Sequence, residues 1–243
     1  MMAVCSLKRL IPISHLWIAS LLAVLACAAI AVAQTSENGN HKESAASTYS
    51  YQYDGARFYL SLIEVDLDAA GKGEIRFKRG EAEDLINLPV ALRPETIARI
   101  QQLYNETDFL NSNADYQSKK DFSHLGWITV GAQAGERTRK VRFNYTTNLQ
   151  IEELANIFRA IATQEIHLFD LETMQQYQPL DLPHQLESVE TSLRLGNIAE
   201  PERIRLALQT LSGDDTLPLI ARNKAARIVA DIEKKKYKSP MKK

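Results

Sequence analysis

A short segment of the sequence contains the three residue types of a serine-hydrolase triad, because Asp121, Ser123 and His124 follow one another within four positions. In such a triad the nucleophile, the base and the acid converge from separated segments. Neighbours in an extended segment instead point to opposite faces, and the sequence contains no Gly-x-Ser-x-Gly elbow. We therefore expect His124 to be a polar or half-buried residue at the start of the strand that follows it.

A row of carboxylates lies along the first predicted hairpin, where Glu64, Asp66 and Asp68 fall at alternate positions and so share one face. Glycoside hydrolysis uses two such groups, but its general acid needs a pKa that is raised by an apolar pocket. These three residues lie beside a turn, which favours solvent-exposed carboxylates. An envelope hydrolase with a site assembled from dispersed residues, Glu64, Asp121 and His124, remains an alternative hypothesis.

The turn of this hairpin resembles a calcium-binding loop, because acidic residues or glycine occupy positions 1, 3, 6 and 9 of residues 66–77. The glutamate required at position 12 is missing, since Phe77 stands there, and Ala70 occupies position 5. Three histidines lie beyond residue 48, and none stands in a known metal-ligand spacing: His124, His167 and His184. We therefore predict no catalytic, metal or cofactor site.

The N-terminal residues 1–33 have the order of a secretory signal peptide. Lys8 and Arg9 precede an apolar stretch at 16–33, which closes on the small residues Ala31-Val32-Ala33 before the polar Gln34. This order predicts export to the periplasm or the extracellular space. An apolar stretch of this length also just reaches across a bilayer, so an uncleaved membrane anchor remains an alternative.

Both cysteines, Cys5 and Cys27, lie inside this leader, so apolar packing alone must stabilise the mature chain. The lack of disulfides in an exported protein favours a bacterial source. With 29 basic and 30 acidic residues, the chain has no electrostatic footprint for nucleic acid. The lysine-rich tail at 234–243 is typical of a solvated helix end. A weak contact of these lysines with an anionic membrane is the alternative.

Residues 34–48 are polar and lack apolar periodicity, which predicts a disordered linker. Tyr49, Tyr51 and Tyr53 alternate with polar residues, and we assign them to an opening edge strand. The patterns then predict strands at residues 57–65, 74–78 and 85–92, and a second hairpin that pairs 125–131 with 137–145 around a turn at 133–136.

Two helices accompany these strands in a domain at residues 49–164. One begins at Pro94 and repeats Ile97, Ile100, Leu103 and Tyr104 at helical spacing, and the other opens at Thr147, where Thr147-x-x-Gln150 has the form of a capping box. The sequence therefore predicts an α+β fold, in which an antiparallel sheet of two hairpins has two helices packed on one face.

Residues 165–243 predict a small helical subdomain that ends in the basic tail. A helix at 166–177 precedes three short amphipathic segments, which are centred on Leu186 to Leu193, Ile204 to Leu211 and Ala221 to Ile232. Helices this short cannot bury an apolar face alone, so we expect them to pack on one another or on the sheet domain.

Two resemblances accompany these patterns. The stretch from Tyr59 to Ile161 resembles an uncharacterised family of exported bacterial α+β domains, on the basis of Gly73-Glu-Ile-Arg-Phe77, Asp108-Phe109-Leu110, Tyr116, His124-Leu-Gly126 and Val141-Arg-Phe143. That resemblance implies a small exported fold and no particular activity. The last helix pair, 199–211 and 217–233, resembles a HEAT-like helical hairpin.

These observations favour a non-enzymatic binding or protein-interaction module in the bacterial cell envelope, with an unknown protein as its partner. The leader, the two subdomains and the scarcity of convergent reactive residues motivate this hypothesis. The alternatives from other classes are the hydrolase described above and a membrane-tethered scaffold that retains its leader.

Overall fold

The structure is a computed structural model that describes residues 46–55, 57–80 and 83–238. The predicted signal peptide and most of the predicted linker lie outside the described residues. Residues 46–48 of that linker are described, and the backbone N–H of Ser47 donates to Gln133 O at 2.6 Å. In the described part of the chain, no helix combines the length and the apolar character needed to cross a bilayer.

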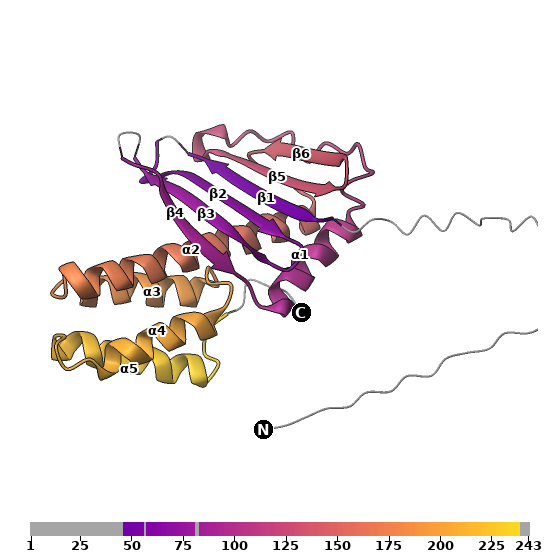
Figure 1. Cartoon of the computed structure of the whole chain (residues 1–243). Coiled ribbons are helices and arrows are strands. Elements are labelled where there is room, and N and C mark those ends of the chain that lie inside the picture. Colours follow the sequence, from indigo (N-terminus) through magenta and orange to yellow (C-terminus); the bar gives the residue numbers. More distant parts are fainter. Residues whose placement is uncertain (1–45, 56, 81–82, 239–243) are drawn as a thin grey trace, which may run out of the picture. The chain divides into compact units, whose positions relative to one another are not determined.

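Six antiparallel strands form one sheet in the order β4-β3-β2-β1-β5-β6 (Figure 1). Their bounds are β1 Thr48–Asp54, β2 Leu60–Asp68, β3 Lys72–Arg79, β4 Ile86–Ala91, β5 Trp127–Ala134 and β6 Arg137–Phe143. The predicted α+β fold is confirmed. The hairpin strands are displaced from their predicted bounds, since β2 begins three residues later than predicted and β5 extends into the predicted turn at 133–136.

The prediction that the opening strand lies at a sheet edge is wrong, because β1 pairs with β2 on one side and β5 on the other. The long connection through α1 brings β5 back beside β1, and sequence patterns do not specify such a return. Tyr49 and Tyr51 are consequently buried. The Tyr49 ring stacks on Tyr104, with centroids 5.1 Å apart, and the Tyr51 ring stacks on Phe158 at 5.5 Å.

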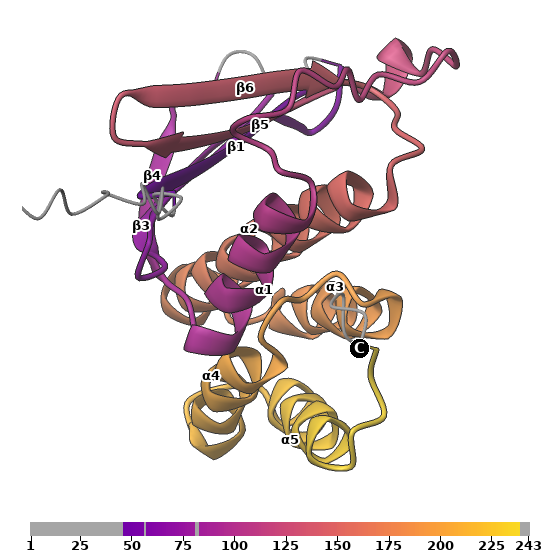
Figure 2. The same cartoon turned by 90° about the vertical axis from the view of Figure 1, so that its right-hand side faces the viewer.

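Helices cover one face of the sheet, as predicted. Helix α1 (Pro94–Glu106) and helix α2 (Leu149–Tyr177) both lie against the inner face (Figure 2). The strands alternate accordingly: Ile63, Val65 and Leu67 of β2 are buried, whereas Glu64 and Asp66 point to the outer face. The sheet therefore has an apolar inner face and a polar outer face.

Helix α2 starts one residue later than the predicted capping box implies. Asn148 caps it, because the Asn148 side chain accepts a hydrogen bond from Ile151 N at 2.9 Å. No glycine or proline interrupts residues 149–177, so the helix runs unbroken through the predicted domain boundary at residues 164 and 165. Its buried residues up to Ile166 belong to the sheet core, and Leu171 belongs to a second cluster of apolar residues.

That second cluster holds the C-terminal helices together. They are α3 (Leu182–Leu195), α4 (Pro201–Gly213) and α5 (Leu219–Glu233), and α4 and α5 pack closely as the predicted helical hairpin. Gly196 ends α3 in the left-handed conformation, with φ of 77°, as expected for a glycine C-cap.

A buried carboxylate joins the helical subdomain to the sheet domain. Glu200 precedes α4 and is 2% exposed, and its Oε1 accepts hydrogen bonds from Arg93 N at 2.8 Å and Thr96 Oγ1 at 2.7 Å. Both donors lie at the N-terminus of α1, where the helix dipole favours a negative charge. The Glu200 backbone N–H donates in turn to Gln164 Oε1 at 2.6 Å, which ties the same point to α2.

We predict that Glu200→Ala lowers the free energy of unfolding by about 3 kcal/mol, because two donors lose a charged acceptor in a buried place. The matched control is Glu202→Ala two residues later, where a partly exposed carboxylate pairs with Arg205. That change should remove about 1 kcal/mol or less. Urea unfolding at neutral pH compares the two variants, and equal losses would contradict the proposed role of Glu200.

Candidate functional site

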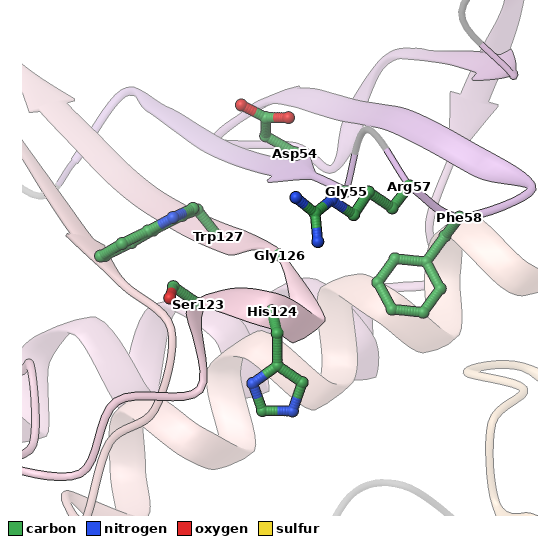
Figure 3. A pocket seen from close by; sticks show the side chains of 8 residues that line it. All are labelled: Asp54, Gly55, Arg57, Phe58, Ser123, His124, Gly126 and Trp127. Atoms are coloured by element: carbon green, nitrogen blue, oxygen red, sulfur yellow. The ribbon is translucent and has the colours of Figure 1, made fainter.

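Polar, charged and aromatic side chains come together at one end of the sheet, where β1 ends and β5 begins. Asp54 and Trp127 face each other across these two strands. The loop after β1 and the loop before β5 enclose an open hollow of about 340 Å³ (Figure 3). Its lining residues are Asp54, Gly55, Arg57, Phe58, Ser123, His124, Gly126 and Trp127.

The Tyr53 side chain holds both loops in place. Its hydroxyl donates a hydrogen bond to Leu125 O at 3.0 Å. A Cβ atom on Gly55 would overlap that hydroxyl, and a Cβ atom on Gly126 would lie 2.8 Å from the Tyr53 ring and 2.6 Å from Asp54 O. Because only glycine leaves room for the ring at both positions, the two loops close tightly around Tyr53 and the hollow keeps its form.

The loop before β5 is fixed from its other side by Asp121. The Asp121 Oδ1 accepts hydrogen bonds from Ser123 N and from Asn144 Nδ2, both at 2.8 Å. The hydrogen bond from the Ser123 backbone is the main cause that lowers the pKa of Asp121, and the Ser123 side chain and Asn144 act in the same direction. Asp121 is therefore an ionised anchor of the loop.

The residues of the hydrolase hypothesis do not share one hollow. His124 lines the hollow at the sheet end, and Asp121 stands beside it on the same loop, with its carboxylate bonded to Ser123 and Asn144. Glu64 lies on the outer face of the sheet, where its Oε2 accepts from Arg76 Nε at 2.9 Å, and it lines a separate hollow of about 110 Å³.

Phe58 and Trp127 line the hollow at the sheet end, and further aromatic rings lie next to His124. Phe58 is 42% exposed, and the Phe122 ring lies 5.0 Å from the Tyr145 ring and 6.0 Å from the His124 ring. Sequence patterns do not single out Phe58, because the predicted strand at 57–65 includes it as part of the sheet. We call the residues Phe58, Phe122, His124, Leu125, Trp127 and Tyr145 the aromatic rim.

Charged groups lie among these rings. The Arg142 guanidinium stacks over the Trp127 ring, 4.6 Å from its centroid, and its Nη2 lies 3.9 Å from Asp54 Oδ2. Arg57 reaches into the hollow from the loop after β1 (Figure 3). The site therefore combines rings that can bury apolar area with groups that can make charge-assisted hydrogen bonds.

A second group of hydrolase-type residues occurs between α2 and α3, where His167 Nε2 lies 2.8 Å from Ser192 Oγ. Gln185 Nε2 lies 3.2 Å from His167 Nδ1 and 3.4 Å from Asp170 Oδ2, so it is the amide nitrogen that faces both. The Gln185 amide thus occupies the position beside Nδ1 where a serine hydrolase has a carboxylate.

In the turn that resembles a calcium loop, the Asp68 carboxylate accepts hydrogen bonds from the backbone of the same turn. Asp68 Oδ1 accepts from Ala70 N at 2.8 Å and from Lys72 N at 2.9 Å. Within the described ranges, no group of three or more His, Cys, Asp or Glu side chains is arranged to hold a metal ion.

Comparison with protein-family models gave no match, and neither did comparison with curated proteins.

We predict that Gly126→Ala lowers the free energy of unfolding by about 3 kcal/mol or more. Gly126 has φ of 95° and ψ of −179°, a region open essentially to glycine alone, and the added methyl meets Asp54 O. The matched control is Gly135→Ala in the turn between β5 and β6, where φ is 58° and the methyl meets open space. It should lose about 1 kcal/mol. Thermal unfolding compares the two variants, and a Gly126 variant as stable as the control would contradict the predicted clash and backbone strain at Gly126.

We predict that His167 makes stability fall as the pH is lowered. Burial lowers the pKa of His167, while Asp170 partly opposes this effect. The unfolded chain therefore takes up the proton at a higher pH than the native state, and the free energy of unfolding decreases as the pH falls through the usual histidine range. The difference in unfolding free energy between wild type and His167→Gln should shrink between pH 8 and pH 5. A difference that stays constant over this range would refute the prediction.

Proposed function

We propose that this protein is an exported bacterial module that binds a protein partner in the cell envelope without catalysing a reaction. The aromatic rim and the hollow at the end of the sheet are its binding surface. The observation that carries this proposal is the hollow lined by Phe58, Trp127 and Arg57, which lies between loops that Tyr53 and Asp121 hold in place. Aromatic residues and arginine are the types that contribute most to protein interfaces.

Rigid loops support recognition in particular. A binding surface that is already ordered loses less conformational entropy when a partner arrives. The hydrogen bonds of Tyr53 and Asp121, together with the tight packing at Gly55 and Gly126, supply this order before binding.

The contacts of the candidate reactive groups favour binding over hydrolysis. Two carboxylates of the hydrolase hypothesis already have partners, because Asp121 is bonded to Ser123 and Asn144 and Glu64 is bonded to Arg76. Neither environment is apolar, and a carboxyl that acts as a general acid at neutral pH needs an apolar one. These contacts support roles in loop order and in surface charge.

Export follows from the leader at residues 1–33, and we place the mature protein in the periplasm or outside the cell. The remaining alternative is a scaffold that keeps its leader as a membrane anchor. N-terminal sequencing of the protein from the envelope fraction separates the two. Gln34 at the terminus supports release, and Met1 at the terminus of membrane-bound protein supports the anchored scaffold.

We predict that a photo-cross-linking residue at Phe58 or Leu125 forms an adduct with one defined partner in living cells. Both side chains lie on the aromatic rim and are substantially exposed. The matched controls are Tyr177 and Leu180, which are even more exposed but lie beyond the rim, at and after the end of α2. Mass spectrometry of the adducts identifies the partner.

A Trp127→Ala change should reduce the adduct at Phe58, because it removes the largest ring of the hollow without touching the cross-linking position. Adducts of equal yield at Tyr177, or no adduct at either rim position, would count against the proposed binding surface.

A further inference from the structure

The Arg57 guanidinium is available for a ligand. Arg57 is exposed, and no described residue forms a hydrogen bond or an ion pair with its side chain. Figure 3 shows the guanidinium extending toward the centre of the hollow, between Phe58 on one side of the view and Trp127 on the other. A guanidinium offers a planar fork of donors that matches a carboxylate.

The pairing of charges around the hollow leaves Arg57 for an anion. Asp54 is the one carboxylate among the lining residues, and it lies 3.9 Å from Arg142 Nη2. Because Asp54 pairs with Arg142, Arg57 is the one arginine or lysine of the lining, and it has no carboxylate partner among the described residues. The neighbouring Asp121 carboxylate is held by the Ser123 backbone N–H and by Asn144. An incoming carboxylate meets Arg57 without displacing an existing partner.

The surroundings of Arg57 favour an apolar group next to that anion. Phe58 and Trp127 offer ring surface, and His124 can donate a further hydrogen bond. A volume of about 340 Å³ accommodates a few side chains of a peptide. A carboxylate beside an aromatic or aliphatic side chain fills both parts of the hollow.

We propose that the hollow recognises a peptide segment in which a carboxylate adjoins an apolar side chain, with Arg57 as the carboxylate-binding residue. This inference rests on the proposed function, since it names the chemistry that the partner presents. The carboxylate can belong to an Asp or Glu side chain or to the C-terminus of a polypeptide, and the test distinguishes these two sources.

The fluorescence of Trp127 provides a local signal. The sequence contains two tryptophans, and the Trp17→Phe change in the leader makes Trp127 the sole tryptophan of the full chain. The protein is titrated with three short peptides of Gly, Ser and one Phe. The first peptide contains Asp before Phe and has an amidated C-terminus. The second is the same peptide with Asn in place of Asp. The third contains neither Asp nor Asn and ends in a free carboxylate after Phe.

We expect the Asp peptide or the free-carboxylate peptide to bind at least about tenfold more tightly than the Asn peptide, as one charge-assisted pair provides. Whichever peptide binds more tightly identifies the source of the carboxylate. Arg57→Ala should abolish the tenfold preference and retain the weaker affinity for the Asn peptide. Arg57→Lys should restore part of the preference, because it keeps the charge and loses the fork.

The control variant is Lys72→Ala, which removes an exposed cation at the opposite end of the sheet and should leave the preference unchanged. Unchanged urea midpoints for the exposed Arg57 variants show that the fold is intact. Equal affinities for the Asp, Asn and free-carboxylate peptides would overturn the carboxylate inference and leave the binding surface standing. A lack of any Trp127 response at millimolar peptide would also overturn it, whereas the rim cross-links decide the proposed function independently.

Discussion

The packing of helices against one face of the sheet determines what the molecule can present to a partner. Helix α2 supplies buried residues to the sheet core through Ile166 and to the helical cluster from Leu171 onward. Because α1 and α2 cover the inner face, the strands alternate between buried apolar and exposed polar residues. On the sheet domain, groups for recognition therefore lie on the outer face or at the ends of the strands.

The sheet end near Tyr53 is where this arrangement produces a defined hollow. Asp54 at the end of β1 pairs with Trp127 at the start of β5, so the chain leaves one strand and enters the other at that point. Tyr53 sits between the departing loops, with its hydroxyl bonded to Leu125 O and with glycine on either side of its ring. Burial raises the pKa of the Tyr53 hydroxyl above its ordinary value, so the group is protonated at neutral pH with a margin to spare. The contacts of Tyr53 thus connect the central strand β1 to the surface that we propose for binding.

Local patterns in the sequence predict much of the fold. Pro94 and the spacing of Ile97 to Tyr104 specify α1, and the glycine turns specify the two hairpins. The central position of β1 is not predictable in this way, because pairing with β5 depends on a chain return of more than seventy residues. The contact of Glu200 with Arg93 and Thr96 is likewise long-range, with a separation of 107 and 104 residues.

The candidate site shows the same contrast between what local sequence patterns predict and what depends on the rest of the fold. His124 attracts attention by its residue type, and the structure places it in the hollow. Arg57 and Phe58 attract none, because their exposure depends on β2 beginning at Leu60, three residues after the predicted start. A boundary error of this size is enough to move an exposed ring into a predicted strand.

Hydroxyl-radical footprinting of the protein in intact cells tests most directly whether the sheet end is occupied by a partner. Oxidation of Phe58 and Trp127 is compared with oxidation of Tyr177 in cells and in the purified protein. A partner on the aromatic rim should lower the oxidation of Phe58 and Trp127 several-fold in cells and leave Tyr177 unchanged. Identical oxidation of all three residues in the two settings would mean that the rim is bare in the cell, contrary to the function proposed for it.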